Sequence, residues 1–272
     1  MTILNGIKLK GNETFTELLK IGKKKKRPKK DNSKKGDIFI NCRSCNDYIR
    51  GDWRSSFDGR YCKYLTGILY LAPARTSGFN VCPMASAGCK ASCLFTAGRG
   101  RFSNVYNGRL NKTLWYFLER ESFLNKLRRE IKALIKKAKR LKLKPAVRLN
   151  GTSDIDWNIH GLYNEFPKVK FYDYTKIYKR ALKYVNGEYP KNYHLTYSLN
   201  EDNKQKASYI LKRGGNISAV FRNKKLPKKF KNFRVIDGDK SDLRFNDPKN
   251  VVVGLYAKGR AKKDNTGFVL DV

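Results

Sequence analysis

Short apolar segments alternate with helical patterns through the C-terminal half of the chain, and this alternation limits the fold more than any other feature. Helical patterns at residues 177–185 and 201–212 each follow an apolar segment. Strands separated by helices are typical of parallel sheets built from βαβ units. The segments that predict strands are ILYLAPA at 68–74, AVRLN, VKFYDY, YHLTYS, ISAVFR, FRVID and VVVGLY. About seven such strands predict an α/β fold, a partial or distorted (β/α) barrel with mainly parallel strands.

Residues 107–144 contain the clearest helical pattern, in which apolar residues recur every three or four positions. The polar face of its second half is almost entirely basic. This face carries Lys126, Arg128, Arg129, Lys132, Lys136, Lys137, Lys139 and Arg140. Such a stripe suits a phosphate backbone, but the solvated outer face of a barrel helix has the same composition, so the sequence leaves both interpretations open.

The charge balance of the whole chain is extreme. Among 272 residues, 60 Lys and Arg stand against 23 Asp and Glu, a formal net charge of +37. A surface this positive attracts polyanions, so nucleic acid, either DNA or RNA, is the expected partner. A basic surface that only maintains solubility is the alternative. Hydrophobic residues make up 40% of the chain, which is enough for most of it to fold.

We expect two parts: residues 1–64 as a basic, cysteine-containing N-terminal extension, and residues 65–272 as the α/β barrel-like domain. The extension contains KKKKRPKKDNSKKG at 23–36, which repels itself and predicts a mobile arm or loop. The chain has no apolar run of membrane-spanning length, and residues 1–10 lack a signal-peptide pattern. The sequence therefore predicts a cytoplasmic protein with reduced cysteines and no membrane partner.

Three of the six cysteines, Cys82, Cys89 and Cys93, lie in one short segment directly after the strand predicted at 68–74. Cys89 and Cys93 are spaced i and i+4, so on a helical turn their sulfurs share one face. Crowded thiolates in an intracellular chain usually bind a metal or an iron–sulfur cluster. Three ligands leave one position of a tetrahedral metal or a cuboidal cluster open for chemistry. A closed zinc site and buried unliganded thiols are the alternatives.

The other three cysteines, Cys42, Cys45 and Cys62, predict a possible second metal site. A C-x2-C turn is a common half of a zinc site, because its tight loop directs both sulfurs inward. The set is incomplete in sequence, since the two histidines, His160 and His194, are far away along the chain. A second three-cysteine site, a zinc site completed by a histidine or an acid, a zinc shared with the first group, and free thiols all remain open.

Polar residues gather where the predicted strands end. In parallel α/β folds these ends meet at one edge, which is the usual functional edge. We therefore expect the acids and lysines there to act as bases, cation ligands or cofactor contacts, although a helix cap explains any single aspartate. The predicted catalytic residues are Asp154, Asp173, Lys176 and Lys258. The predicted cofactor-binding residues are Asn150, Thr152, Ser198, Asp237 and Asp239.

Several strings resemble the phage gene product 88 family, an uncharacterised group: LAPA, CP followed by two cysteines, LNGTSDIDW, FYDYTK, HLTYS, DGDKSDLRFNDP and GLYAKGRAK. The resemblance runs from about residue 65 to the end. The chain is more distantly similar to radical SAM enzymes, which place a three-cysteine 4Fe–4S cluster after the first strand of a partial barrel. Their usual spacing is C-x3-C-x2-C, whereas this chain has C-x6-C-x3-C. That similarity implies S-adenosylmethionine as a cofactor, with its amine and ribose held by Asp154, Asp173 and Ser198.

Three functions are consistent with these patterns. The first, which we favour, is an iron–sulfur enzyme that acts on nucleic acid or a nucleobase. A radical SAM-like enzyme is one form that it could take. The second is a nucleic-acid-binding phage protein of the replication type with structural zinc. The third is a metal-dependent nuclease that uses the strand-end aspartates.

Overall fold

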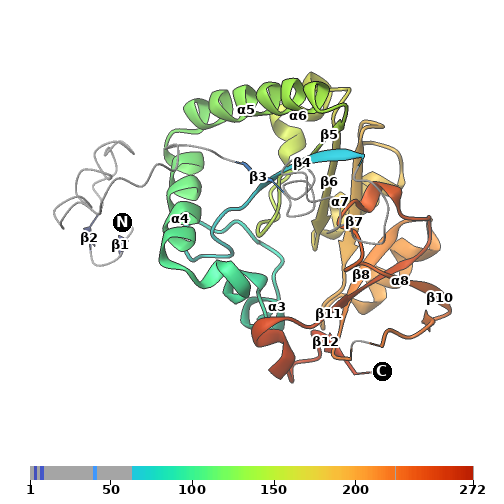
Figure 1. Cartoon of the computed structure of the whole chain (residues 1–272). Coiled ribbons are helices and arrows are strands. Elements are labelled where there is room, and N and C mark those ends of the chain that lie inside the picture. Colours follow the sequence, from blue (N-terminus) through green and yellow to red (C-terminus); the bar gives the residue numbers. More distant parts are fainter. Residues whose placement is uncertain (1–2, 5–6, 9–38, 42–62, 224, 272) are drawn as a thin grey trace.

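A computed structural model describes residues 3–4, 7–8, 39–41, 63–223 and 225–271. Their main feature is a 10-stranded sheet in which most strands run parallel (Figure 1). The strands lie in the order β3-β4-β5-β6-β7-β8-β11-β10-β9, and β12 pairs with β8 beyond the end of β7. The sheet is open, since β3 and β9 form its edges. A separate antiparallel pair joins β1 (Ile3–Leu4) to β2 (Ile7–Lys8).

All neighbours from β4 through β10 pair in parallel, and only the two edge strands are antiparallel. Five consecutive strands, β4 to β8, are also consecutive in the sheet, as in a sequentially wound barrel. The strands are β3 (Phe39–Asn41), β4 (Tyr64–Leu69), β5 (Lys144–Arg148), β6 (Lys170–Thr175), β7 (Tyr193–Ser198), β8 (Asn216–Phe221), β9 (Lys229–Phe230), β10 (Phe233–Asp237), β11 (Val252–Tyr256) and β12 (Val269–Leu270).

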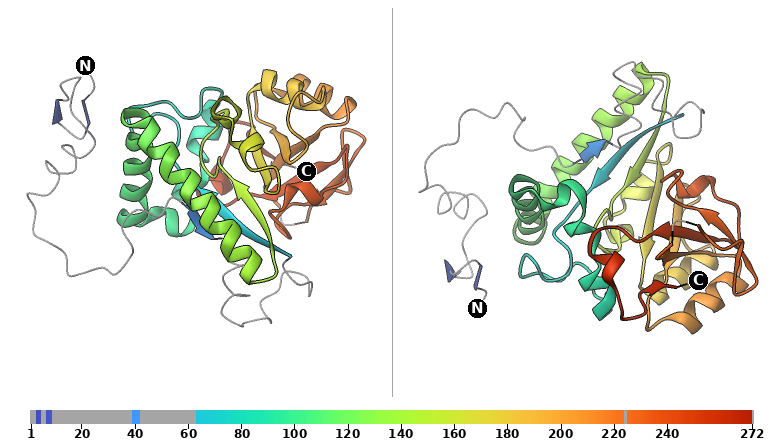
Figure 2. Two further views of the ribbon diagram at one scale, coloured as in Figure 1. Left: turned by 90° about the horizontal axis from the view of Figure 1, so that it is seen from above. Right: turned by 60° about the horizontal axis from the view of Figure 1, so that its bottom comes forward.

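Two long helices, α4 (Ser103–Leu118) and α5 (Arg120–Arg140), lie together on one flank of the sheet, where α5 contacts β4 and β5 (Figures 1 and 2). Two shorter helices follow β6 and β7: α7 (Tyr178–Val185) packs on β6 and β7, and α8 (Lys204–Lys212) packs on β7 and β8. The remaining helices are short. They are α3 (Ala87–Ala91), α6 (Leu162–Glu165) and the 3₁₀ helices η3 (Leu94–Thr96), η4 (Gly98–Arg101), η5 (Trp157–His160), η6 (Arg244–Asn246) and η7 (Gly259–Lys263).

Apolar side chains bury the helices against the sheet in two main clusters. The larger one joins α5 to β4 and β5 through residues such as Leu127, Ile131 and Val147, all fully buried. The second joins α8 to β7 and β8, with Leu211 and Phe221 at its centre. Each fully buried aliphatic or aromatic side chain contributes about 1.5–3 kcal/mol through removal from water.

The sheet is curved, and the chain after β10 fills its concave side. The Phe245 ring lies 4.9 Å from the Tyr64 ring of β4 and 5.5 Å from the Tyr172 ring of β6. Asp242 accepts hydrogen bonds from Arg148 of β5 at 3.0 Å and from the Tyr172 hydroxyl at 3.0 Å. In a flat sheet six strand spacings would separate β4 from β10 by about 29 Å, too far for this partly helical segment to cross. The curvature is consistent with a partial barrel.

The predicted α/β class with mainly parallel strands is confirmed. One local prediction is wrong. The strand predicted at 68–74 is β4, which ends at Leu69, because Gly151 and Thr152 bond to the carbonyls of Leu69 and Leu71 and replace sheet pairing. The last strands are not separated by α-helices: β8, β9, β10 and β11 are joined by loops and by η6.

The N-terminal extension cannot be assessed as a unit, since most of residues 1–64, including the basic run at 23–36, lie outside the described residues. Residues 39–41 pair with β4 as an antiparallel edge strand, so at least this piece joins the main sheet. The division at residue 64 stays a prediction. Among the described residues, no helix combines the length and the apolar character needed to cross a membrane.

Candidate functional site

The cysteine-containing segment, which includes α3, lies at the carboxyl edge of the parallel sheet beside the C-terminal segment (Figure 1). The chain leaves β4 and turns back over residues 73–81, where the N–H of Val81 bonds to the carbonyl of Ala74 at 3.0 Å. Cys82 follows directly, Cys89 lies within α3, and Cys93 comes just after it. We call residues 82–93 the cysteine loop.

Glu201, from the turn after β7, holds the start of this loop. Its carboxylate accepts the Gly88 N–H at 2.7 Å and the Ser86 hydroxyl at 2.8 Å. The Ser86 oxygen in turn accepts the Cys89 N–H at 3.2 Å as the cap of α3. A methyl group on Gly88 would lie 2.8 Å from the Glu201 Oε1 and 2.1 Å from the Thr266 Oγ1. Gly88 therefore lets α3 dock closely on the segments that follow β7 and β11.

Asp264 holds the other end of the loop. Its carboxylate accepts the Ser92 hydroxyl at 3.3 Å, the Thr266 hydroxyl at 2.8 Å and the Val269 N–H at 3.0 Å. Burial alone would raise the pKa of Asp264, but these hydrogen bonds lower it below its usual value. The cysteine loop is thus held on both sides of Cys89 by carboxylates from the segments that follow β7 and β11.

The loop after β5, residues 149–157, forms the second part of the site. The Asn150 side-chain oxygen accepts bonds from the Ser153 hydroxyl, the Ile155 N–H and the Trp157 indole N–H at 2.8–3.1 Å. Asp173, which is only 1% exposed, accepts the backbone N–H of Asn150 at 2.7 Å and its side-chain N–H at 3.1 Å. Burial raises the pKa of Asp173 to about 7. Asn150 and Asp173 therefore shape this loop from within.

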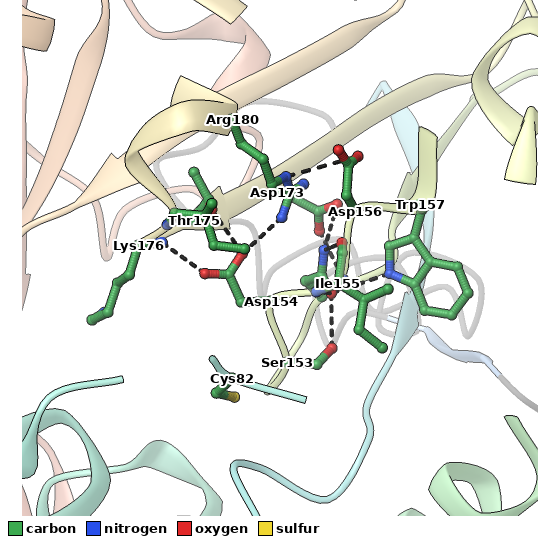
Figure 3. Close-up of polar contacts among 12 residues, drawn as sticks. Cys82, Ser153, Asp154, Ile155, Asp156, Trp157, Asp173, Thr175, Lys176 and Arg180 are labelled. Carbon is green, nitrogen blue, oxygen red and sulfur yellow. Dashed lines mark hydrogen bonds and ion pairs between the residues drawn. The ribbon is translucent and has the colours of Figure 1, made fainter. Parts of the chain in front are cut away.

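Asp154 links the same loop to β6 and α7 (Figure 3). Its carboxylate accepts the Thr175 hydroxyl at 2.7 Å, the Lys176 N–H at 2.8 Å and the Arg180 guanidinium at 2.7 Å. Arg180 is buried and also donates to the Tyr193 hydroxyl at 2.9 Å. Neither Asp154 nor Asp173 caps a helix, so the alternative interpretation of these two residues as caps is wrong.

Cys82 lies against this loop, on the side away from Arg180 (Figure 3). Its sulfur accepts the Ala74 N–H at 3.4 Å and lies 3.6 Å from the Thr152 carbonyl oxygen, and the Asp154 N–H bonds to the neighbouring Val81 carbonyl at 2.7 Å. Burial, with a smaller contribution from the Asp154 charge, raises the pKa of the Cys82 thiol to about 12. Asp154 thus lies within electrostatic range of the cysteine loop.

The three thiols influence one another. Cys89 and Cys93 both add to the raised pKa of Cys82, and Cys89 adds to that of Cys93, which burial raises most. The Cys93 sulfur also receives the Phe95 N–H, an interaction that favours a thiolate. In the described part of the chain, however, no three His, Cys, Asp or Glu side chains are placed to hold a single metal ion.

Two cations lie near Cys93. Lys176 and Arg109 both favour its thiolate form. Arg109, on α4, is 8% exposed and lies over the rings of Tyr70 and Phe95, at 4.9 and 5.1 Å from the ring centres. Its Nε and Nη1 are buried and form no hydrogen bond in the described structure. Buried guanidinium groups are rarely left unpaired, so this one indicates an acceptor beside the cysteine loop.

Lys176 connects the cysteine loop to a pocket at the ends of β6 and β7. Its ammonium donates to the Ser198 hydroxyl at 2.7 Å and lies 5.5 Å from the Phe268 ring centre. The pocket has a volume of about 230 Å³, with residues 83–86 of the cysteine loop as one wall. Tyr178, Tyr197 and Lys206 contribute to the other side. The predicted residues Lys176, Ser198, Asp154 and Thr152 therefore gather around the cysteine loop.

Asp237, Asp239 and Lys258 form a separate group at the ends of β10 and β11. Asp237 accepts the Tyr256 hydroxyl at 3.0 Å, and Asp239 pairs with Lys258 and accepts the Tyr256 N–H at 2.8 Å. Four strand spacings separate β10 from β6, about 19 Å along the sheet. The structure does not bring this group into contact with Asp154 or the cysteines.

The possible second metal site cannot be placed, since Cys42, Cys45 and Cys62 lie outside the described residues. The two histidines proposed to complete it have other partners. His160 lies 3.0 Å from the Tyr116 hydroxyl, and His194 lies 3.2 Å from the Tyr184 hydroxyl. Burial lowers the pKa of His194 to about 4 and also lowers that of His160.

Sequence reasoning missed Glu201, Asp264 and Arg109. Glu201 and Asp264 belong to the same class as the predicted strand-end acids, and their position after β7 and β11 was a usable signal. Arg109 had no such signal, because it lies in a helix where basic residues are frequent. Its importance follows only from its burial and its unpaired nitrogens.

A family model described as gene product 88 matches residues 18–272. The match begins well before residue 65, so the expectation that the first 60 residues lie outside the resemblance is wrong. No curated protein and no solved structure matches the chain, so the distant similarity to radical SAM enzymes gains no support. The match spans most of the chain, and we conclude that the chain belongs to the gene product 88 family of phage proteins.

Proposed function

We propose that this protein is an iron–sulfur enzyme that acts on nucleic acid, with Cys82, Cys89 and Cys93 as the three cysteine ligands of a 4Fe–4S cluster. One observation carries the proposal. The three thiols belong to one loop and are close enough to shift one another's pKa, and the buried Arg109, whose Nε and Nη1 have no hydrogen-bond partner, lies near Cys93. The loop lies at the carboxyl edge of a parallel sheet, where α/β proteins usually bind their ligands.

The donor set fits a cluster better than a single zinc ion. Zinc holds its four ligands about 2.0–2.3 Å from one centre, so the ligand atoms crowd together. The described thiols are not gathered this closely. The cysteines of a cuboidal cluster bind different irons and are therefore farther apart than ligands of one ion. Metal binding also replaces the thiol protons, which offsets the cost of buried thiolates shown by the raised pKa of Cys82.

Arg109 supplies what such a group needs from the protein. Three thiolates and the sulfides of a cluster carry negative charge and accept hydrogen bonds, and such bonds tune a cluster's reduction potential. The unpaired Nε and Nη1 of Arg109 provide donors, and its charge already favours the Cys93 thiolate. The N–H groups of Ala74 and Phe95 donate to the sulfurs of Cys82 and Cys93.

When bound, a cluster with three cysteine ligands supplies one-electron chemistry and one iron without a cysteine. S-Adenosylmethionine is the ligand that the distant resemblance implies for such an iron, and we keep it as the first cofactor to test. The chain itself contributes a positioned lysine, Lys176, beside the cysteine loop. Lys176 lies between Cys93 and the pocket and is oriented by Ser198, while Asp154 fixes the Lys176 backbone.

Support for a nucleic-acid partner comes from α5. Its exposed basic residues recur so that they form one continuous stripe along the outer face of the helix. None of them forms an ion pair within the described part of the chain, whereas Lys126 and Arg128 pair with Glu130 and Glu165. The stripe consists of Arg129, Lys132, Lys136, Lys139 and Arg140.

Serine substitution of each cysteine tests the ligand set. Cys82→Ser, Cys89→Ser and Cys93→Ser should each reduce the iron and sulfide content of anaerobically purified protein by at least about fivefold, because a site with two thiolates rarely retains a cluster. Lys90→Ala, an exposed change inside the same loop, is the control and should retain the metal. Combined Cys42→Ser/Cys45→Ser/Cys62→Ser should retain it as well. Loss of iron in the combined variant alone would move the site to the N-terminal cysteines and refute the proposal.

A further inference from the structure

The pocket beside the cysteine loop offers mainly hydrogen-bond donors. Tyr197 is 1% exposed, and its hydroxyl lies near Asn203 but forms no hydrogen bond of good geometry. Lys176 uses one of its three ammonium protons on Ser198, which leaves two. Lys206 adds an exposed ammonium from α8.

Acceptors are scarce in the same pocket. The side-chain oxygens of Asn200 and Asn203 already accept backbone N–H groups, at 3.1 and 2.8 Å. Asp202 contributes the one carboxylate of the pocket lining, and it is exposed. A pocket with two ammonium groups, an unpaired buried hydroxyl and one carboxylate selects a ligand rich in acceptors and negatively charged.

The rest of the pocket is apolar and aromatic. Pro83 and Met84 form part of one wall, and Met84 is 51% exposed although it is a large hydrophobic residue. Tyr178 contributes a ring from the start of α7, and the Lys206 ammonium lies 5.7 Å from its centre. Aromatic faces of this kind stack on nucleobases with little sequence preference. At about 230 Å³ the pocket suits one small unit rather than a stretch of polymer.

We infer that this pocket binds a single nucleotide, with Lys176, Lys206 and Tyr197 as contacts to its phosphate and Tyr178 and Met84 against its base. The inference deepens the proposed function and rests on it for the role of the bound nucleotide, but binding itself needs no cluster. A phosphate-bearing nucleotide reaches this site either as a free mononucleotide or as the 5′ end of a nucleic acid strand.

Calorimetric titration at 150 mM salt tests the inference on full-length protein and on the cluster-free Cys82→Ser/Cys89→Ser/Cys93→Ser variant. The probes are thymidine, thymidine 5′-monophosphate, and a ten-nucleotide strand with and without a 5′-phosphate. We expect the monophosphate to bind at least about tenfold more tightly than thymidine, a difference of about 1.4 kcal/mol. Tighter binding of the 5′-phosphorylated strand than of the monophosphate identifies the 5′ end of a strand as the ligand. Tighter binding of the monophosphate identifies a free nucleotide as the ligand.

Three variants locate the binding site. Lys206→Gln and Tyr197→Phe should each weaken binding of the monophosphate at least about fivefold, in both the cluster-containing and the cluster-free protein. Lys204→Gln removes the same charge from the same helix outside the pocket and should change affinity less than twofold. Equal losses for Lys204→Gln and Lys206→Gln, or equal affinities for thymidine and its monophosphate, would overturn the inference. A protein that lacks iron but binds the nucleotide as expected would refute the proposed function and leave this inference standing.

Discussion

Single carboxylates determine how the cysteine loop is held. Glu201 accepts two hydrogen bonds from the start of α3, and one of its partners, Ser86, passes the interaction on to the N–H of Cys89. Both donors lie in a region that is largely removed from water, since Ser86 and Gly88 are buried. Removal of Glu201 therefore leaves buried donors without an acceptor, which is more costly than the mere loss of a surface contact.

Glu201→Ala should lower the free energy of unfolding of the metal-free protein by about 2 kcal/mol, and Glu201→Gln by about 1 kcal/mol, because glutamine keeps one acceptor oxygen. Urea denaturation measures both values. Asp202→Ala, a change at the next residue with an exposed carboxylate, should stay within about 0.5 kcal/mol of the wild type. Similar effects at positions 201 and 202 would show that Glu201 does not organise the loop.

Asp173 gives stability a pH dependence of known sign. Burial raises its pKa to about 7 in the folded protein from 3.8, so the folded state binds this proton more tightly than the unfolded state. The corresponding stability is fully present at low pH and is lost as the pH rises through about 7. Between pH 5 and 8 the free energy of unfolding of the wild type should fall relative to Asp173→Asn by on the order of 2 kcal/mol.

Urea denaturation at several pH values measures this difference. Other buried groups such as His194, whose pKa burial lowers to about 4, are present in both proteins and cancel in the comparison. Parallel profiles for the two proteins would mean that Asp173 stays ionised, held by the N–H groups of Asn150.

At the scale of elements, α5 has two faces with different tasks. Its apolar face packs on β4 and β5, and its outer face carries the basic stripe. A stripe that contacts phosphates releases counterions on binding, so affinity falls with salt at a log–log slope of about −0.9 per phosphate on duplex DNA. A stripe that only keeps the protein soluble would have little effect on that slope.

Combined Lys132→Gln/Lys136→Gln/Lys139→Gln should reduce the magnitude of the salt slope for duplex DNA by up to about 2.7, one contact for each lysine. Fluorescence anisotropy over a range of salt concentrations measures the slope. Lys168→Gln/Lys191→Gln/Lys249→Gln removes the same charge from exposed positions elsewhere and should change the slope much less. Equal changes in both combined variants would assign the attraction to the net charge of the protein rather than to α5.

At the scale of the whole molecule, the sequence predicts the sheet better than the site. β6, β7 and β8 are rich in aromatic and β-branched residues and are followed by clear turns or helices, so local pattern locates them. β9 and β12 have two residues each, too few for any pattern. The helical pattern at 107–144 does not show where the helix is interrupted, and in the structure α4 and α5 meet at Glu119.

The site depends on contacts between distant parts of the chain. The cysteine spacing and the strand-end acids could be found in sequence, because each is a local pattern. The contacts of Glu201 with α3 and of Asp264 with Ser92 join residues more than a hundred positions apart, and no local pattern encodes a partner at that distance. Asp242, which follows β10, similarly contacts Arg148 on β5, 94 positions away in the chain.

The most direct test of the proposed iron–sulfur site is the iron, sulfide and zinc content of the wild-type protein purified without oxygen. A single three-cysteine cluster predicts about four irons and four sulfides per chain, a brown colour, and an electron paramagnetic resonance signal after reduction. The signal should change when S-adenosylmethionine is added if that molecule binds the open iron. A colourless protein with about one zinc per chain and no sulfide would contradict the proposal and identify a structural zinc site instead.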